Sequence, residues 1–369
     1  RSFSKQERSV IQNGPFFMGK TMITFTRRTV IAAAFAAAAM IAAPTSFAQA
    51  APEKTDVTIA VGGKSLYYYL PLTIAERLNY FKDEGLNVKV VDFQGGSRSL
   101  QAVVGGSADV VSGAFEHTLS MQAKNQPMVA FVLQGRAPQQ ALLVSNKKMK
   151  DYKQISDLKG KKIGVTAPGS SSQAVLTYIL AQGGLGPKDV AFIGVGSSSG
   201  AVSALRSGQI DALINLDPVV TILLQNGDAE MAVDTRKVSE AEKIFNGDLV
   251  AGTLYAPEAF VKKNPNTVQA LTNAMVRANQ WLTKASAEEV AKVVPESYLM
   301  GNREVYLAGF EGNRDALSPD GRFPDGCAQI SLDVLRKVND KLDPAKLDLG
   351  RVYTNKFVDE ALKKYPLSK

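Results

Sequence analysis

Two glycine- and serine-rich segments have the composition of an anion-binding site. Residues 95–97 read Gly-Gly-Ser and residues 168–172 read Pro-Gly-Ser-Ser-Ser, and each precedes a stretch with helical periodicity. The first N–H groups of a helix have no partner inside the helix, so they can donate to an oxyanion together with serine hydroxyls. An ordinary serine N-cap would explain the same residues. The residues that we expect to contact a ligand here are Gly96, Ser97, Gly169, Ser170, Ser171 and Ser172.

A third segment, residues 115–117, could add side-chain chemistry to such a site. Phe115 could form a wall of the pocket, Glu116 could accept a hydrogen bond from a ligand amine, and His117 could donate to an oxyanion. Glu116 and His117 could equally bond to each other or to nearby backbone groups. All three residues follow an apolar run that is typical of a buried strand, so we expect them at the end of that strand.

Four more residues have a ligand-binding explanation beside an ordinary structural one. Tyr67 and Tyr68 could stack on a ligand or donate to it, although an aromatic triplet also packs well in a core. Lys64 could pair with an anion. Asp217 could lie at a hinge or at the rim of a pocket, or could cap a helix that begins near Pro218. We retain Lys64, Tyr67, Tyr68 and Asp217 as ligand-binding candidates.

The two Gly/Ser segments belong to a chain with an internal repeat. Residues 95–113 and residues 196–214 each contain a Gly/Ser-rich loop, a short segment with an apolar stripe, a glycine turn and an aspartate that opens an apolar run. We interpret each copy as a loop, a helix of two turns, a tight turn and a buried strand. The corresponding turn residues are Gly106 and Asp109 in the first copy and Gly208 and Asp211 in the second.

The repeat extends toward the N-terminal side of each copy and predicts two β-loop-α-β-loop-α-β units. Strands that alternate with helices imply largely parallel sheets, so we predict an α/β fold with two mixed, mostly parallel sheets. Ligands bind outside the carboxyl ends of the strands in open sheets of this kind, where the candidate loops would lie. The predicted strands that precede the two copies are residues 57–61, 88–92, 162–166 and 190–194.

Composition and charge exclude several classes of function. The 369 residues are 45% hydrophobic and 21% charged, which is ordinary for a globular protein and long enough for two domains. The net charge of +8 is inflated by residues 1–50, which hold six basic residues and one acidic residue. No basic run with interleaved aromatic residues is present, so we expect no nucleic-acid partner. The single cysteine, Cys327, excludes an internal disulfide and a cysteine-rich metal site, and we expect no cofactor.

Residues 1–50 contain the pattern of a secretory signal. Arg27 and Arg28 precede the apolar run of residues 30–43, Pro44 ends that run, and Ala48-Gln49-Ala50 fits a cleavage site. The run is short for a membrane span. We therefore expect cleavage after Ala50 and a periplasmic product, exported by the general or the twin-arginine route.

Five stretches follow one another in an order that is typical of one protein family. They are residues 71–88, with Pro71, Ala75-Glu76, Tyr80-Phe81 and Glu84 to Val88; residues 95–110; residues 157–165; residues 204–212; and Asp217-Pro218. In this respect the chain resembles the periplasmic substrate-binding proteins of sulfonate-, taurine- and nitrate-type ABC importers, over about residues 55–365. The resemblance implies two lobes joined by two crossovers, with the ligand cleft between them.

The resemblance also implies how the chain is divided and what it does. Residues 51–140 and 249–369 would form the first lobe with the C-terminal helices, and residues 141–248 would form the second lobe. A monomer would capture a small anionic organic solute, sulfonate-like in our interpretation, by hinge closure. It would deliver that solute to an ABC permease and its ATPase, and it would not be an enzyme.

Three alternatives share this fold. The chain could be a pyrimidine-precursor binding protein, an enzyme similar to the thiamine-pyrimidine synthases, or a ligand-sensing subunit. Those synthases are cytosolic and carry a cysteine-rich motif, whereas this chain has one cysteine, one histidine and a signal-like segment. One histidine leaves few arrangements for acid–base catalysis, which favours binding over catalysis.

Overall fold

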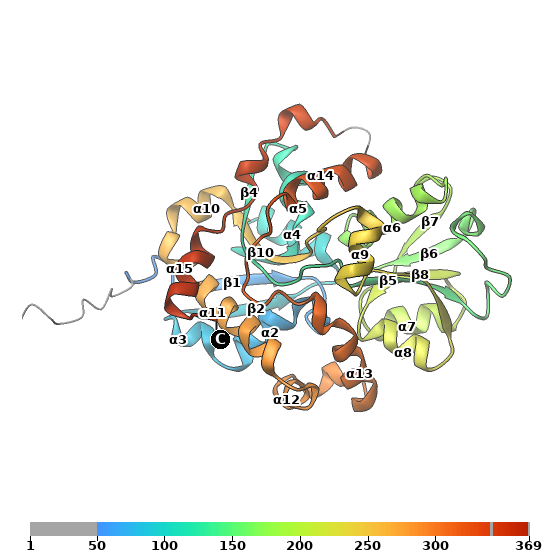
Figure 1. The fold of residues 1–369 in the computed structure, drawn as a ribbon, viewed down its shortest axis with the longest axis horizontal. Coiled ribbons are helices and arrows are strands. Elements are labelled where there is room, and N and C mark those ends of the chain that lie inside the picture. Colours follow the sequence, from blue (N-terminus) through green and yellow to red (C-terminus); the bar gives the residue numbers. More distant parts are fainter. Residues whose placement is uncertain (1–49, 340–341, 368–369) are drawn as a thin grey trace, which may run out of the picture. The chain divides into compact units, whose positions relative to one another are not determined.

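This computed structural model describes residues 50–339 and 342–367, which Figure 1 colours by sequence. Apart from Ala50, the predicted signal segment lies outside the described residues. Within the described ranges, no helix combines the length and hydrophobicity that crossing a bilayer requires. The described strands form two five-stranded sheets, and both are mixed, which confirms the predicted α/β fold.

Five strands make up the first sheet: β1 Asp56–Val61, β2 Asn87–Asp92, β3 Val110–Ala114, β4 Met128–Leu133 and β10 Gly252–Pro257. Their order is β2-β1-β3-β10-β4. β1 pairs in parallel with β2 and β3, whereas β10 runs antiparallel to both of its neighbours. β3 and β4 are buried along their whole length, as expected for strands that are covered on both faces.

Five strands also make up the second sheet: β5 Gln140–Ser145, β6 Lys162–Val165, β7 Ala191–Gly194, β8 Ala212–Leu216 and β9 Ala229–Asp234. Their order, β7-β6-β8-β5-β9, repeats the plan of the first sheet. β6 pairs in parallel with β7 and β8, and β5 is the antiparallel strand between β8 and β9. We call the first sheet with its helices the first lobe and the second sheet with its helices the second lobe.

The two copies of the internal repeat have matching structural roles. An oxygen of Asp109 accepts from the backbone N–H of Thr58 in β1 at 2.9 Å. An oxygen of Asp211 accepts from the backbone N–H of Lys162 in β6 at 2.8 Å. Each aspartate therefore fastens the strand that it opens to the neighbouring parallel strand of its own sheet, β1 in the first lobe and β6 in the second, which explains why the motif occurs twice.

The helices that begin beside the strands are α2 Leu70–Arg77, α3 Tyr80–Asp83, α4 Gly96–Val104, α5 Glu116–Gln122, α6 Ser171–Gln182, α7 Ser199–Arg206, α8 Val219–Gln225 and α9 Val238–Phe245. The later helices are α10 Glu258–Lys263, α11 Pro265–Lys284, α12 Ala287–Val293, α13 Arg303–Asn313, α14 Cys327–Val338 and α15 Lys356–Lys364. α2 and α3 are separate helices because Asn79, which lies between them, adopts a left-handed conformation with φ 60°.

Two crossovers connect the lobes. Residues 134–139 lead from β4 to β5, and residues 235–251 lead from β9 to β10 by way of α9. Backbone hydrogen bonds join each crossover to a strand. The N–H of Thr235 in the second crossover donates to the carbonyl of Gln140 in β5 at 2.8 Å, and the N–H of Gln134 in the first crossover donates to the carbonyl of Gly252 in β10 at 2.7 Å. Such a pair of adjacent segments is suited to act as a hinge.

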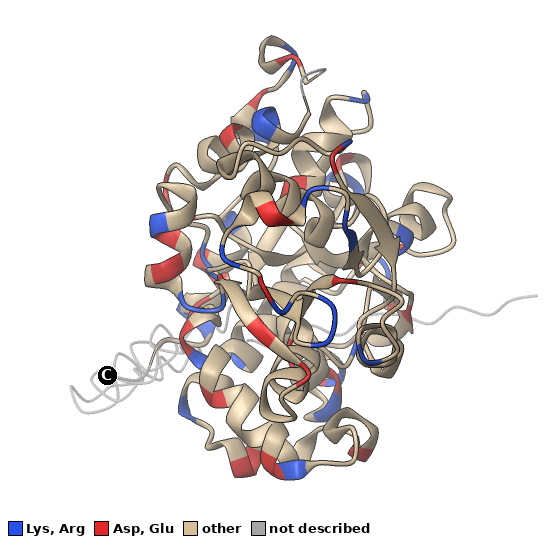
Figure 2. Ribbon diagram, turned by 90° about the vertical axis from the view of Figure 1, so that its right-hand side faces the viewer, with Lys and Arg blue, Asp and Glu red and all other residues tan. Residues whose placement is uncertain are grey.

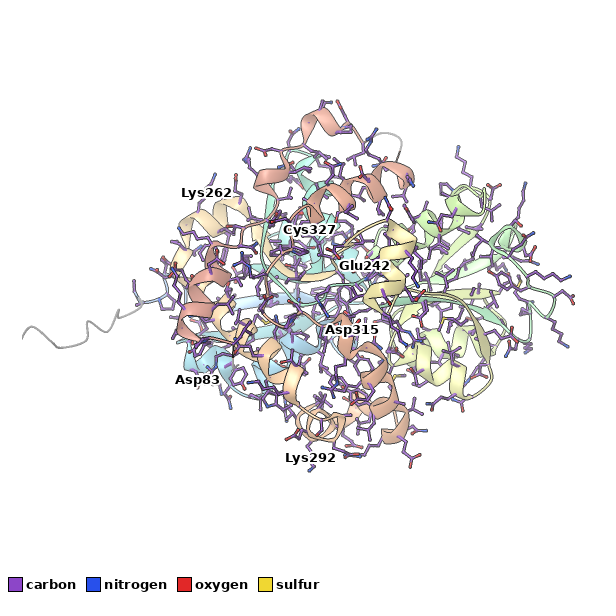
Figure 3. The ribbon with its side chains drawn as sticks, in the orientation of Figure 1. Asp83, Glu242, Lys262, Lys292, Asp315 and Cys327 are labelled. Carbon is purple, nitrogen blue, oxygen red and sulfur yellow. The ribbon has the colours of Figure 1, made fainter. Side chains whose placement is uncertain are left out.

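Two of the later helices contact both lobes. α13 packs against α8 of the second lobe, while its residues Tyr306 and Phe310 belong to the core of the first lobe. α14, which begins at Cys327 (Figure 3), packs against α6 of the second lobe and α5 of the first. On the face drawn in Figure 2, basic and acidic residues are interspersed, as the mild charge beyond residue 50 predicts.

Candidate ligand-binding site

The two predicted Gly/Ser segments meet where the lobes touch. The backbone N–H of Ser97, in the first turn of α4, donates to Oγ of Ser170 at 3.0 Å. The hydroxyl of Ser97 donates to the carbonyl of Pro168 at 2.9 Å, and the two serine Oγ atoms lie 3.2 Å apart. The starts of α4 and α6 are therefore held together by direct bonds between residues 73 positions apart in the chain.

A glycine permits this close approach. Gly95 has φ +90°, and a Cβ atom added there would lie 2.7 Å from Cβ of Ala167 and 3.1 Å from Oγ of Ser170. Both of those atoms belong to the second lobe. Any side chain at position 95 would therefore collide with the opposite lobe as well as strain its own backbone.

A closed cavity of about 20 Å³ lies beside the contact between the lobes. A water molecule needs roughly 10–15 Å³ of such space, so the cavity has room for a water but not for an organic solute. Both lobes contribute to its wall. The lining includes Tyr68, Tyr69, Gly96 and His117 from the first lobe and Gln140, Thr166, Ser170, Ser171 and Ser172 from the second.

Three polar atoms of this wall are buried without a hydrogen-bond partner among the described residues. They are the hydroxyl of Tyr68, Nε2 of His117 and Oε1 of Gln140. Only 3%, 5% and 1% of these residues is exposed, respectively. An unsatisfied buried polar group costs about 1–3 kcal/mol, so three around one cavity indicate groups that await a ligand or ordered water.

His117 is held in a defined orientation. Its Nδ1 lies 2.8 Å from the hydroxyl of Tyr255 on β10, which leaves Nε2 directed to the cavity. Burial lowers the pKa of the His117 imidazole below its usual value, and the Glu116 carboxylate and the nearby backbone of Gly169 only partly offset that effect. Burial raises the pKa of the Tyr255 hydroxyl, so the pair is uncharged near pH 7. His117 can therefore bind a ligand as a neutral donor or acceptor.

An open pocket of about 190 Å³ lies next to the closed cavity, and His117 and Ser170 belong to the walls of both. Its remaining lining comes from α5, α6 and α14 and includes Glu116, Ser120, Gly169, Gln173, Thr177, Leu335 and Val338. A further space of about 10 Å³ lies between Glu116, Ser171 and Ser331. The spaces share walls, so a modest movement of the lobes would join them into one cleft.

Two of the predicted serines already have partners in the second lobe. The amide nitrogen of Gln140 donates to Oγ of Ser171 at 3.2 Å. Oγ of Ser172 accepts from the backbone N–H of Thr166 at 3.0 Å. Ser172 therefore fastens the start of α6 to the end of β6, as an ordinary capping serine would, while still lining the cavity.

The structure places Lys64, Tyr67 and Phe115 away from these spaces. Nζ of Lys64 lies 2.6 Å from a carboxylate oxygen of Glu76. The hydroxyl of Tyr67 donates to the carbonyl of Tyr306 at 2.5 Å. Phe115 is fully buried and packs with Phe323 and Tyr353, with ring centroids 5.5 and 6.0 Å away. These contacts give all three residues a structural role.

Asp217 belongs to a buried polar network at the base of the lobes. One of its oxygens accepts from the N–H of Thr221 at 2.8 Å. The other accepts from Arg236 at 3.0 Å and from the amide of Asn313 at 2.6 Å. Arg236 begins the second crossover and Asn313 ends α13, so Asp217 connects β8 to the hinge rather than facing the cavity.

Sequence reasoning missed Gln140, Tyr69 and Tyr255. Gln140 and Tyr255 lie on β5 and β10, the two antiparallel strands. The rule that ligands bind at the carboxyl ends of strands does not find Gln140, because β5 is antiparallel and brings its amino end to that edge of the sheet. The Tyr67–Tyr69 triplet is the signal that could have found Tyr69; the structure turns Tyr67 to the core and Tyr68 and Tyr69 to the cavity.

Comparisons with known proteins agree with this architecture. The model of the NMT1-like family matches residues 50–295. A solved structure of a protein from Bordetella bronchiseptica is 57% identical, covers 85% of this chain and 99% of its own, and has a TM-score of 0.84. A 4-amino-5-hydroxymethyl-2-methylpyrimidine phosphate synthase of Aspergillus parasiticus is 26% identical over 69% of this chain and 75% of its own.

Two periplasmic proteins of solved structure share the fold at lower identity. The nitrate-binding protein NrtA from Synechocystis is 18% identical, with a TM-score of 0.70 over 86% of this chain and 91% of its own. The aliphatic sulphonate binding protein SsuA from Escherichia coli is 20% identical, with a TM-score of 0.61 over 82% of this chain and 93% of its own. The arrangement of two mixed sheets is therefore that of periplasmic binding proteins.

Proposed function

The chain belongs to the NMT1-like family, and on that premise we propose that it is the periplasmic solute-binding component of an ABC importer. One observation carries the proposal: Tyr68, His117 and Gln140 present unpartnered buried polar atoms to a cavity that is built from both lobes. Most buried polar groups are hydrogen-bonded, and a binding protein leaves some of them free for its solute, which supports this role for the three atoms.

The solute is a small organic anion, sulfonate-like in our proposal. The starts of α4 and α6 face each other at Ser97 and Ser170, so N–H groups and hydroxyls of both lobes could surround an oxyanion. An oxyanion that accepts from Ser97 and Ser170 would replace their mutual bond by two bonds to itself. Charge-assisted bonds of this kind contribute about 1.5–3 kcal/mol each.

The lobes must separate for the solute to enter. The closed cavity of about 20 Å³ is too small for a sulfonate, and direct bonds join the two helix starts. Movement at residues 134–139 and 235–251 would open the cleft, and closure on the solute would restore the contacts between the lobes. We propose that the closed form is what an ABC permease and its ATPase receive.

The chain binds its solute without converting it. Cys327 is buried at the start of α14, and burial raises the pKa of its thiol to about 12, so it is no thiolate nucleophile near pH 7. The only histidine of the chain is neutral and bonded to Tyr255. The similarity to a pyrimidine phosphate synthase is distant, at 26% identity, and does not favour catalysis.

A ligand screen of the protein without residues 1–50 tests the proposal. Sulfonates, nitrate, carboxylates and pyrimidines would be added in turn while the melting temperature is recorded, because a ligand at 100 times its Kd stabilises the native state by about 2.7 kcal/mol. We expect at least one organic anion to raise Tm. Stabilisation by pyrimidines alone would contradict an anionic solute, and conversion of the bound compound, seen by NMR of the recovered ligand, would contradict a pure binding role.

A further inference from the structure

Glu116 is an acceptor that faces the cleft without a cation. Its Oε1 is buried and has no hydrogen-bond partner among the described residues. The side chain lines the open pocket of about 190 Å³ and the small space next to Ser171 and Ser331. A shielded carboxylate oxygen that lacks a partner is unfavourable, so it indicates a donor that is supplied from outside the chain.

The described walls of the cleft contain no positive side chain. The residues that line the closed cavity, the open pocket and the small space include neither lysine nor arginine. Lys64, the cation that the sequence suggested, is paired with Glu76 at 2.6 Å. Glu116 is therefore the only Asp, Glu, Lys or Arg side chain in these described walls, and a carboxylate has the wrong sign for a solute that is only an anion.

Gln140 provides a second acceptor on the opposite lobe. Its amide nitrogen donates to Oγ of Ser171, so its Oε1 is the atom that remains unpartnered in the closed cavity. Ser171 lines both that cavity and the space beside Glu116. Ser171 therefore lines a space with each acceptor, with Glu116 in one and with Gln140 in the other, and Ser170 lines the cavity with Gln140.

From this geometry we infer that the solute is dipolar: it carries a nitrogen that donates hydrogen bonds to Glu116 and Gln140, besides the oxyanion that Ser97 and Ser170 hold. A protonated amine or an N–H of an amidine or heterocycle has the required chemistry. The inference rests on the proposed function and narrows its solute class. It explains why a carboxylate lies in a cleft whose helix starts favour negative charge.

Matched pairs of compounds test the inference. Ethanesulfonate is compared with 2-aminoethanesulfonate, and propanoate with 3-aminopropanoate, by calorimetric titration of the protein without residues 1–50. Each pair differs by one amine and keeps the same anion. We expect the aminated member of at least one pair to bind at least tenfold more tightly. Equal or weaker binding of both aminated members, while a plain anion binds, would overturn the inference and leave the proposed anionic solute intact.

Two variants locate the effect at the carboxylate. Glu116→Gln keeps the size of the side chain and removes its charge, so it should lose about tenfold in affinity for the aminated compound, whereas the plain anion should bind at least as tightly because a like charge is gone. Glu304→Gln, at an exposed position of α13, makes the same change of charge elsewhere and should alter neither affinity. A preference for the amine that persists in Glu116→Gln would overturn the role of Glu116, and the melting temperature of the free variant verifies that it is folded.

An uncharged probe separates this inference from the proposed function. Cytosine carries N–H donors without an oxyanion. Binding of cytosine that depends on Glu116, with no binding of any anion, would support the donor-recognising carboxylate and refute the anionic solute. Failure of cytosine and of all four matched compounds to bind would overturn the inference, since none of the donors presented to Glu116 would then be recognised.

Discussion

The backbone nitrogen of Ser97 lies 3.0 Å from Oγ of Ser170, so the first turn of a helix in one lobe is bonded to the cap of a helix in the other. The hydroxyl of Ser97 adds a bond to the carbonyl of Pro168 at 2.9 Å. Neither bond can survive when the lobes move apart. The relative free energies of the open and closed forms therefore depend directly on these few atoms.

Ser97→Asp should lower the affinity for the solute at least tenfold. The new carboxylate would face the carbonyl of Pro168 and would repel an anionic ligand, and a tenfold change requires only about 1.4 kcal/mol. Isothermal titration with the solute found by screening measures the loss. Ser203→Asp, at an exposed position of α7, makes the same substitution outside the cleft and should bind as the parent does. Parental affinity of a folded Ser97→Asp protein would show that the anion is held elsewhere.

Gly95→Ala should prevent full closure. The added Cβ would lie 2.7 Å from Cβ of Ala167 across the contact between the lobes. Gly106→Ala is the matched control, because Gly106 also has a positive φ, +76°, but its Cβ would meet nothing within 4 Å. Both variants should lose stability, by about 1 kcal/mol from backbone strain. Only Gly95→Ala should show a larger radius of gyration with saturating solute in X-ray scattering; equal radii for the two would refute the steric explanation.

His117 should make the native state less stable as the pH falls through 6.5. Burial lowers its pKa in the folded protein, whereas Glu116 and the backbone of Gly169 oppose that shift and Lys124 reinforces it; Tyr255 is the neutral partner. The unfolded chain therefore binds the proton first, and stability declines below the ordinary pKa by up to about 1.4 kcal/mol per pH unit.

His117→Gln removes that proton uptake. Calorimetric melting of both proteins at pH 7.5 and pH 5.5 should show the larger decrease in Tm for the parent chain. The chain has only one histidine, so no second imidazole obscures the comparison. Identical decreases in the two proteins would mean that His117 does not titrate differently in the folded and unfolded states.

Asp217→Ala should destabilise the fold strongly. The substitution leaves Asn313 without its carboxylate partner and deprives the partly buried Arg236 of one of its two anions. Removing one partner of a buried ion pair costs about 3–5 kcal/mol, and we expect the lower end because Asp234 keeps its bond to Arg236 at 2.7 Å. Urea unfolding measures the difference. Glu240→Ala breaks an exposed pair with Lys243 and should cost at most about 1 kcal/mol; a similar loss in both variants would contradict the structural role of Asp217.

The exported protein should begin at or within a few residues of Ala51. This expectation rests on the basic, apolar and Ala-Gln-Ala segments before that position. N-terminal sequencing of protein from the periplasmic fraction gives the cleavage point. A membrane-retained product that still contains residues 30–43 would contradict it.

The fold was predictable because its repeat has a local chemical cause. Asp109 and Asp211 each follow a glycine turn at the same spacing, and each accepts from a backbone N–H of the parallel strand beside it, β1 or β6. The position of β10 between β3 and β4 was not predictable in this way, because that pairing joins segments more than 100 residues apart. Periodicity within a segment carries no information on which distant strand it will pair with.

The candidate site was predictable only in part, for a related reason. The helix starts at Ser97 and Ser170 have a sequence signature of their own, and the structure brings them together. Gln140 has no such signature, since a glutamine before an apolar run is usually a solvated strand end. Its role depends on the reversed direction of β5, which is a property of the whole sheet.

The strand order also determines which sheet can be completed first as the chain emerges. All five strands of the second sheet lie within residues 140–234. When a chain crosses a membrane from its N-terminus, these strands therefore emerge one after another as a single continuous segment. The first sheet has by then received β1 to β4 but still lacks β10, which pairs with both β3 and β4. Until residue 257 has emerged, β3 and β4 each have unpaired backbone N–H and C=O groups on the side where β10 pairs with them. The second lobe can thus be complete while the first remains exposed to chaperones, proteases and other chains.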